Sequence, residues 1–152
     1  MTNVSERDKA AFFQAVDAAS RKAVWCAVAS VDARGAPRVR IVHPTWEGDV
    51  LWVATGTGSP KFKQIAKDPR VDVQYLVSPP DFIHILCRGS AQIVTDAAEK
   101  KRVWSVFDYD LAQFWPGGPT DANYALIGIR PVRVELSKMF GTLDKQVWRR
   151  PG

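Results

Sequence analysis

The sequence contains little cysteine and histidine, no long apolar run and no block of like charge. Its 152 residues include two cysteines, Cys26 and Cys87, and two histidines, and neither set has the spacing of a disulfide framework or a metal site. We therefore expect free thiols and no bound metal. Charges or prolines interrupt every hydrophobic stretch before the ~20 residues that a membrane-spanning helix needs. No signal-peptide pattern opens the chain, so we expect a cytoplasmic protein without a membrane partner.

The distribution of charge also argues against a nucleic-acid partner. The formal net charge is +5, and the 21 Lys and Arg residues are spread along the chain rather than gathered in one segment. No Ser-His-Asp or Cys-His arrangement is visible, so hydrolysis by a protein nucleophile has little support and no catalytic residue is assigned. The length and the 46% hydrophobic content predict a single domain over residues 1–152.

Hydrophobic periodicity predicts a mainly β chain with three helices. Helices are expected at residues 6–21, from residue 60 to the Asp68-Pro69 break, and at 97–107. Strands are expected at 24–31, 38–43, 50–54, 71–77, 82–95 and 124–136, with a bend at Gly89 and a kink at Pro131. The first three strands should form an antiparallel meander. Because an open sheet of this size leaves exposed edges, we expect a six-stranded antiparallel β-barrel with peripheral α-helices.

The segment from Thr55 to Lys67, TGTGSPKFKQIAK, carries the most informative functional pattern. A strand ends in a glycine-containing turn, and Ser59 and Pro60 then suit the N-cap and the first position of a helix. The N–H groups and the dipole at a helix start attract anions, and Lys61 adds a positive charge where the dipole disfavours one. No Gly-Lys-Ser/Thr follows the glycines, which argues against a nucleoside-triphosphate loop. We predict a phosphate site, although an ordinary capped helix explains the same residues about equally well.

Two arginines and a histidine are further candidates. Arg38 and Arg40 alternate on a short strand and project to one face, where they are either solvated or share an anion with the turn. His84 lies in an apolar strand, where a hydrogen-bonded core histidine is the commoner explanation. Aromatic residues make up 11% of the chain. Some could stack on a flat ligand or fill a subunit interface, but core packing explains each one singly.

Four segments, taken in order, carry a family resemblance: PRVRIVHP, LWVATGTGSPKFKQIAKDPRVDVQYL, HILCRGSAQIV and YALIGIRPVRVEL. Over about residues 23–136 the chain resembles the pyridoxamine 5'-phosphate oxidase-like flavin-binding split-barrel family, and most closely its general stress protein branch. The resemblance implies a six-stranded split barrel that forms a homodimer. It also implies two flavin mononucleotide (FMN) sites at the dimer interface, each built from both chains.

The resemblance also assigns roles to individual residues. In such proteins, an arginine before the turn, a threonine closing the next strand, and a serine and a lysine at the helix start grip the phosphate end of the flavin. Arg40, Thr55, Ser59 and Lys61 match these positions, and Arg38 would add charge nearby. The partner chain usually supplies a polar residue near the flavin ring from the long fifth strand, and His84 falls at about that position.

The chain departs from pyridoxamine phosphate oxidase proper at three places. Pro60-Lys61 replaces two adjacent basic residues, Thr45 stands in place of a lysine, and the C-terminal Trp-Arg-Arg at residues 148–150 only echoes the signature that binds the substrate phosphate. Vitamin B6 phosphate is therefore not the expected substrate. The resemblance implies an FMN-dependent oxidoreductase acting on an unidentified small molecule. The alternatives are a flavin-binding stress or sensing module without a dedicated substrate, or the same fold with a deazaflavin or haem.

Overall fold

The computed structural model describes residues 1–152 and contains three α-helices and one nine-stranded sheet. The helices are α1 (Lys9–Ala23), α2 (Pro60–Lys67) and α3 (Ala97–Trp104). The strands are β1 (Thr2–Asn3), β2 (Cys26–Val31), β3 (Pro37–Val42), β4 (Thr45–Glu47), β5 (Val50–Gly56), β6 (Arg70–Leu76), β7 (Ile83–Val94), β8 (Tyr124–Lys138) and β9 (Leu143–Arg149). Three short 3-10 helices are η1 (Leu111–Gln113), η2 (Gly118–Thr120) and η3 (Met139–Gly141). No helix is both long and apolar enough to cross a membrane.

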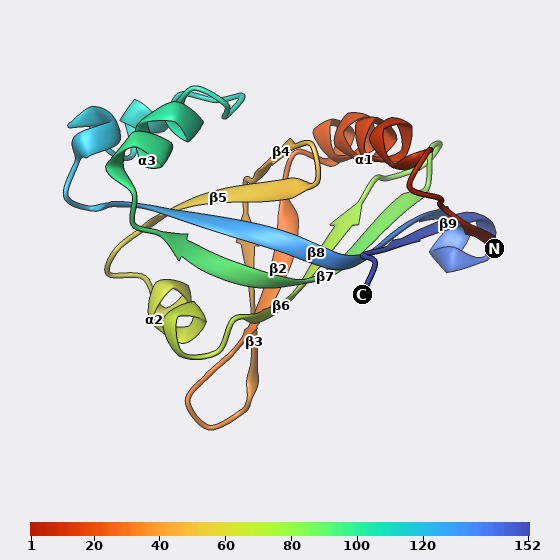
Figure 1. Cartoon of the computed structure of the whole chain (residues 1–152), viewed down its shortest axis with the longest axis horizontal. Coiled ribbons are helices and arrows are strands. Elements are labelled where there is room, and N and C mark those ends of the chain that lie inside the picture. Colours follow the sequence, from red (N-terminus) through yellow and green to blue (C-terminus); the bar gives the residue numbers. More distant parts are fainter.

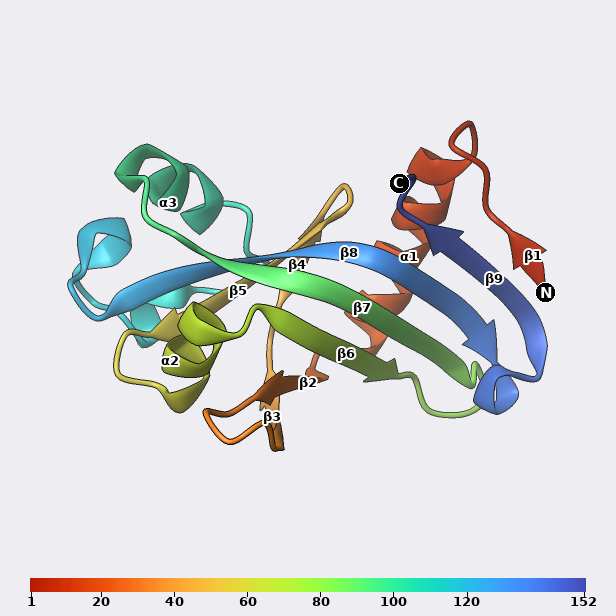
Figure 2. The ribbon, with the colours of Figure 1, turned by 60° about the horizontal axis from the view of Figure 1, so that its bottom comes forward.

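The long strand β8 organises the sheet. It pairs with β7 along its length, with β5 beside its first half and with β9 beside its second half. From β7 the sheet continues through β6 and β2 to β3, and Figure 2 shows β6, β7 and β8 running side by side. Every pairing is antiparallel except β1 with β9. The mainly β, split-barrel prediction is confirmed, although the strand count is nine rather than six.

The predicted three-stranded meander is wrong at its third strand. The hairpin of β2 and β3 forms as expected around a turn at Asp32, and Gly35 takes a positive φ of 81° there. Strand β5, however, pairs with β4 and β8 instead of β3. Its two faces are both buried: Leu51 and Val53 pack into the main core cluster, and Trp52 packs into a second cluster under α3. A strand that is covered on both faces lies inside the fold, whereas the β2–β3 hairpin extends away from it.

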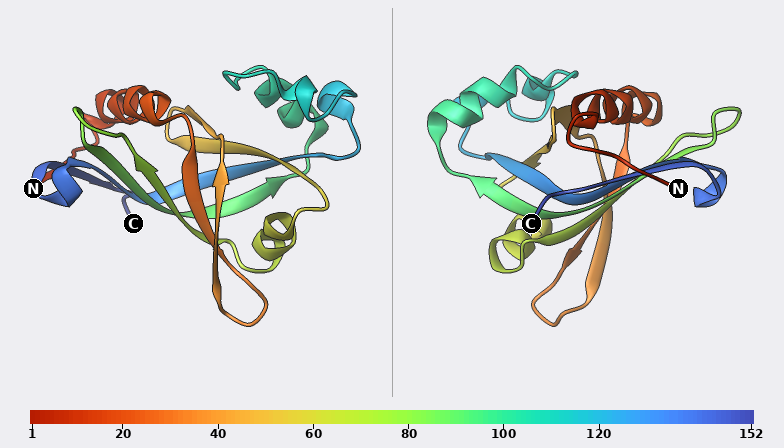
Figure 3. Two further views of the ribbon diagram at one scale, coloured as in Figure 1. Left: turned by 180° about the vertical axis from the view of Figure 1, so that it is seen from behind. Right: turned by 45° about the vertical axis from the view of Figure 1, so that its right-hand side comes forward.

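The helices lie on two sides of this sheet. Figure 1 shows α1 and α3 above it, and α2 below it next to the β2–β3 hairpin, which extends beyond the other strands in Figure 3. Helix α1 buries Phe12, Phe13 and Val16 against the core. It begins at Lys9 rather than at residue 6, because Ser5 and Asp8 first close a hydrogen-bonded turn. Helix α3 ends three residues before the predicted position, at Trp104.

The expected bend in β7 lies at Gly89, where the register against β8 shifts. A Cβ atom at Gly89 would stand 2.8 Å from the carbonyl oxygen of Arg130, so only glycine fits without a backbone shift. Pro131 is the cross-strand partner of Gly89 and brings no N–H to the ladder. The two breaker residues therefore meet at a single irregularity of the sheet, as is usual for a β-bulge.

Candidate functional site

The predicted turn forms as a capped helix start. The Ser59 hydroxyl accepts a hydrogen bond from the Phe62 N–H at 3.3 Å, and Pro60 occupies the first position of α2. The buried Thr55 hydroxyl, at the end of β5, lies 3.1 Å from the Ser59 hydroxyl. Strand β5 and helix α2 therefore bring two of the predicted site residues into direct contact.

The backbone of the turn is less available to a ligand than the sequence suggested. The Thr57 N–H donates to the carbonyl of Asn123 at 3.0 Å, and the Ser59 N–H donates to the carbonyl of Gly56 at 3.0 Å. These two N–H groups are already satisfied, so an anion at the turn would depend on the remaining N–H groups and on side chains. A Cβ atom at Gly58 would meet nothing within 4 Å, which shows that the surface of the turn is open.

Arg40 and Lys61 supply that positive charge. The Arg40 guanidinium is partly buried and donates only to neutral groups, the Ser30 hydroxyl at 3.1 Å and the Gln64 side-chain oxygen at 3.1 Å. Burial lowers the pKa of Arg40. Burial also lowers the pKa of the half-buried Lys61, and the nearby Arg40 charge adds to this shift. Neither cation has a carboxylate within ion-pair distance. The two form a partly desolvated positive site that lacks a counter-charge.

Arg38 projects to the same face of β3 but is already paired. Its guanidinium lies 3.0 Å from the Asp32 carboxylate in the hairpin turn, and its side chain is largely exposed. The contribution of Arg38 to a ligand site remains a prediction that this geometry does not strengthen.

His84 lies at the opposite end of the sheet from the turn. Thr55 pairs with Ala125 at the start of β8, whereas His84 pairs with Ser137 near its end. Twelve residues of strand separate these two positions on β8, up to roughly 40 Å of extended chain. The structure of one chain therefore does not bring His84 to Lys61. The ring is buried, its Nε2 has no hydrogen-bond partner, and Phe140 stacks at a tilt with ring centroids 5.3 Å apart.

The chain has no reactive thiol and no cluster of potential metal ligands. Cys26 and Cys87 are buried and free, and burial raises the pKa of each thiol to about 12, so neither is a thiolate near neutral pH. No group of three or more His, Cys, Asp or Glu side chains is arranged to hold a metal ion.

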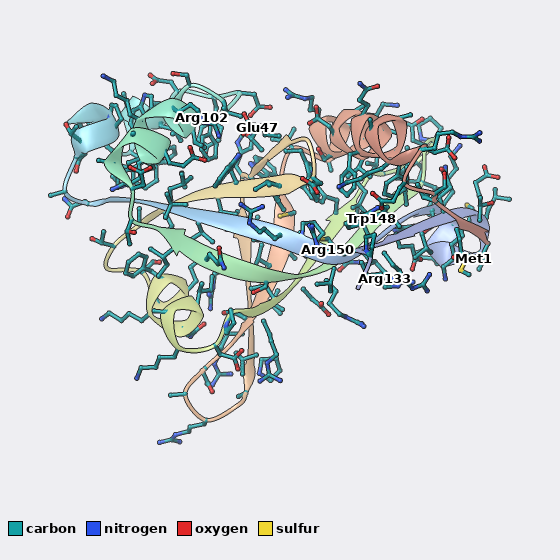
Figure 4. All side chains as sticks on the ribbon, in the orientation of Figure 1. Met1, Glu47, Arg102, Arg133, Trp148 and Arg150 are labelled. Atoms are coloured by element: carbon teal, nitrogen blue, oxygen red, sulfur yellow. The ribbon has the colours of Figure 1, made fainter.

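The C-terminal Trp148 and Arg150 are used in packing. Trp148 is fully buried in β9, and its indole N–H donates to Glu6 at 3.2 Å. The Lys9 Nζ atom lies 5.2 Å from the centroid of the Trp148 ring, and the Arg150 Cζ atom lies 5.3 Å from it. Arg150 also donates to the carbonyl of Pro131 at 2.8 Å, and Figure 4 shows it beside Trp148. Strand β9 lies between β1 and the second half of β8, whereas the β5–α2 turn follows the strand that pairs with the first half of β8.

Sequence reasoning missed two residues that contact Arg40 in the candidate site, Ser30 and Gln64. Gln64 follows Lys61 by three positions and so shares its face of α2, which was a usable signal. Ser30 gave no comparable signal, because its closeness to Arg40 depends on the register of the β2–β3 hairpin.

A family model described as Pyridoxamine 5'-phosphate oxidase matches residues 12–138 of the chain. The chain belongs to this family. A search of curated protein sequences found no match. Among solved structures, it is similar to general stress protein 26 from Bacillus anthracis str. Sterne, with a TM-score of 0.67 and 24% identity over 89% of this chain and 98% of that one.

Two further solved structures are similar to this member of the pyridoxamine 5'-phosphate oxidase family. A pyridoxamine 5'-phosphate oxidase-related, FMN-binding protein from Nostoc punctiforme PCC 73102 has a TM-score of 0.74 and 19% identity, covering 91% of this chain and 90% of that one. An F420 reductase has a TM-score of 0.60 and 24% identity, covering 78% and 94%. At these identities the likeness establishes the fold and leaves the ligand open.

Proposed function

We propose that the chain binds FMN, with the ligand's phosphate at the turn between β5 and α2, and acts as an oxidoreductase on a small molecule. The observation that carries this proposal is the pair Arg40 and Lys61, two partly buried cations without a carboxylate partner. Holding like charges together in a partly desolvated place is unfavourable unless an anion is bound. Membership of the family and the FMN-binding relative support FMN as that anion.

The residues of the turn fit one end of such a ligand. A phosphate carries acceptor oxygens, and Arg40 and Lys61 are donors that also neutralise its charge. The hydroxyls of Thr55 and Ser59 are hydrogen-bonded to each other at 3.1 Å, so one of them donates to the other and the second is left to donate to the phosphate. The flavin itself would supply hydride or electron transfer, so the chain needs only to bind and orient it. No side chain of the turn is assigned an acid or base role.

A homodimer is part of this proposal, and a surface that combines exposed apolar side chains with charged and polar ones supports it. On the side of the sheet away from α1, residues of five strands line up across the ladders in two rows: Val39–Ala29–Asp72–Arg88–Arg133 and Ile41–Ala27–Gln74–Leu86–Glu135. We call this surface the outer face. Val39 and Ile41 are 66% and 67% exposed, and Leu86 is 41% exposed. The exposed apolar residues lie mainly on β3 and are flanked by charged and polar residues of β6, β7 and β8, a combination found in protein interfaces.

His84 lies on the same face of the sheet. In the next row of the ladder, Leu76, His84 and Ser137 are cross-strand partners. The Nε2 of His84 and the Oγ of Ser137 are both buried without a partner. We propose that a second copy binds the outer face with His84 of one chain near the turn of the other, because a single chain does not bring these two parts together. In this arrangement His84 contacts the flavin bound mainly by the partner.

The absorbance spectrum of the purified protein tests the cofactor. Oxidised FMN has two bands in the near-ultraviolet and visible range, whereas a deazaflavin gives one near-ultraviolet band, the outcome that the similarity to an F420 reductase keeps open. Failure of the chain to bind FMN at micromolar concentration would refute the proposal. A yellow dimer that oxidises reduced nicotinamide only at the rate of free FMN would favour the sensing module. A monomer in solution would refute the shared site.

A further inference from the structure

Arg40 is held by two neutral side chains from different elements. Its two terminal nitrogens donate separately, one to the Ser30 hydroxyl and one to the Gln64 side-chain oxygen, each at 3.1 Å. The Ser30 hydroxyl in turn donates to the same Gln64 oxygen at 2.6 Å. The three side chains, from β3, β2 and α2, thus form a closed hydrogen-bonded ring, which we call the Arg40 ring.

The Arg40 ring fixes the guanidinium relative to Lys61. Ser30 is 1% exposed on β2, so its hydroxyl is a buried anchor within the sheet. Gln64 lies three residues after Lys61, on the same face of α2. Because the hairpin and α2 are joined through this contact, Arg40 stays beside Lys61 even though the two charges repel each other. A long side chain that is ordered before its ligand arrives loses less conformational entropy on binding.

The chemistry of Gln64 also matters for the charge of the site. An amide oxygen has two lone pairs, and here they accept from Arg40 and Ser30. A carboxylate at this position could accept the same hydrogen bonds, but it would also pair with Arg40 and cancel its charge. The neutral amide orients the guanidinium and leaves its positive charge available.

We propose that Gln64 and Ser30 are positioning residues that hold Arg40 for the phosphate group of the ligand. This inference rests on the proposed function, since it names the residues that prepare the same site. Gln64 and Ser30 act through Arg40, so their effect on binding should depend on the presence of that side chain and on the presence of a phosphate.

A double-mutant cycle on the full-length apoprotein tests the inference, with FMN and riboflavin as paired probes. The affinity of each variant is measured by quenching of flavin fluorescence, and thermal unfolding checks that each variant folds. Gln64→Leu should weaken FMN binding by up to about 10-fold, the cost of ordering one long side chain on binding, and leave riboflavin binding unchanged. Gln64→Glu should weaken FMN binding at least as much, because the added carboxylate neutralises Arg40.

The Arg40→Ala background separates positioning from a general structural role. There, Gln64→Leu should cause no further loss of FMN affinity, because its target is already absent. Additive losses, an equal loss of riboflavin binding, or wild-type FMN affinity in Gln64→Leu would each overturn the inference. Ser30→Ala is the second variant if Gln64→Leu does not fold, and it should show the same dependence on Arg40. Equal binding of FMN and riboflavin by the unsubstituted protein would instead refute the phosphate site itself.

Discussion

Replacing Lys61 with methionine should separate the binding of the phosphate from the stability of the fold. Methionine keeps an unbranched apolar stem of similar length, so the packing of the half-buried side chain is largely preserved. Only the ammonium group is lost. The matched control is Lys63→Met, because Lys63 is an exposed lysine on the same short helix.

The expected loss of FMN affinity follows from the charge of the site. A hydrogen bond to a charged group contributes about 1.5–3 kcal/mol, which corresponds to roughly 10- to 150-fold in affinity. Lys61 is half-buried rather than fully buried, so screening by solvent favours the lower part of this range. Lys63→Met should change the affinity by less than about 3-fold, the scale of an exposed charge near an anion.

Lys61→Met should weaken FMN binding without lowering the stability of the apoprotein. Burial and the Arg40 charge both disfavour the charged form of Lys61 in the folded state, and Lys61→Met removes both costs. The variant should therefore unfold at the same temperature as the unsubstituted apoprotein or at a higher one. A variant that binds FMN weakly only because it is misfolded would show a lower midpoint instead.

Flavin fluorescence titration of the apoprotein, with FMN and with riboflavin, is the deciding assay. Riboflavin lacks the phosphate, so Lys61→Met should not affect its affinity. Unchanged FMN affinity in Lys61→Met would show that the phosphate does not lie at this turn. An equal loss of FMN and riboflavin binding would show that Lys61 acts through packing and that the charge argument is wrong.

Three further outcomes are expected. Binding of FMN should weaken as the pH rises through the lowered pKa of Lys61 in the free protein, because a bound phosphate favours the protonated amine. Titrations with FMN at several pH values should show this decrease in affinity, and Lys61→Met should abolish it. Ile41→Asp should convert the proposed dimer to a monomer without unfolding it, since the side chain is 67% exposed; light scattering and thermal unfolding measure the two properties, and a persisting dimer would exclude the outer face as the interface. Trp148→Ala should lower the free energy of unfolding, measured by urea denaturation, by about 3–5 kcal/mol, because the side chain is fully buried. The ratio of FMN affinity to riboflavin affinity should stay unchanged, and a changed ratio would link β9 to the site.

Neighbouring residues determined the local structure that the sequence predicted correctly. Ser59 and Pro60 specify the start of α2 through one side-chain hydrogen bond and a fixed φ angle, and both act within four residues. The turn of the β2–β3 hairpin depends on Asp32 and Gly35 in the same local way. Such features need no knowledge of the remaining chain, which is why the helix start and the hairpin could be placed before the structure.

Contacts between distant segments decided what the sequence did not show. Strand β5 pairs with β8 and has a core cluster on each face, and the residue pattern of β5 alone does not identify its partner strand. The register of β2 against β3, together with the packing of α2, places Ser30 and Gln64 around Arg40, whereas Arg38, two residues away, pairs with Asp32.

The distance between His84 and the turn is likewise a property of the sheet. The sequence by itself determined a capped helix start with a lysine in its first turn. Only the tertiary structure decided that this lysine has an uncompensated arginine beside it and that His84 lies at the far end of β8, because strand pairing is set by burial across the whole chain.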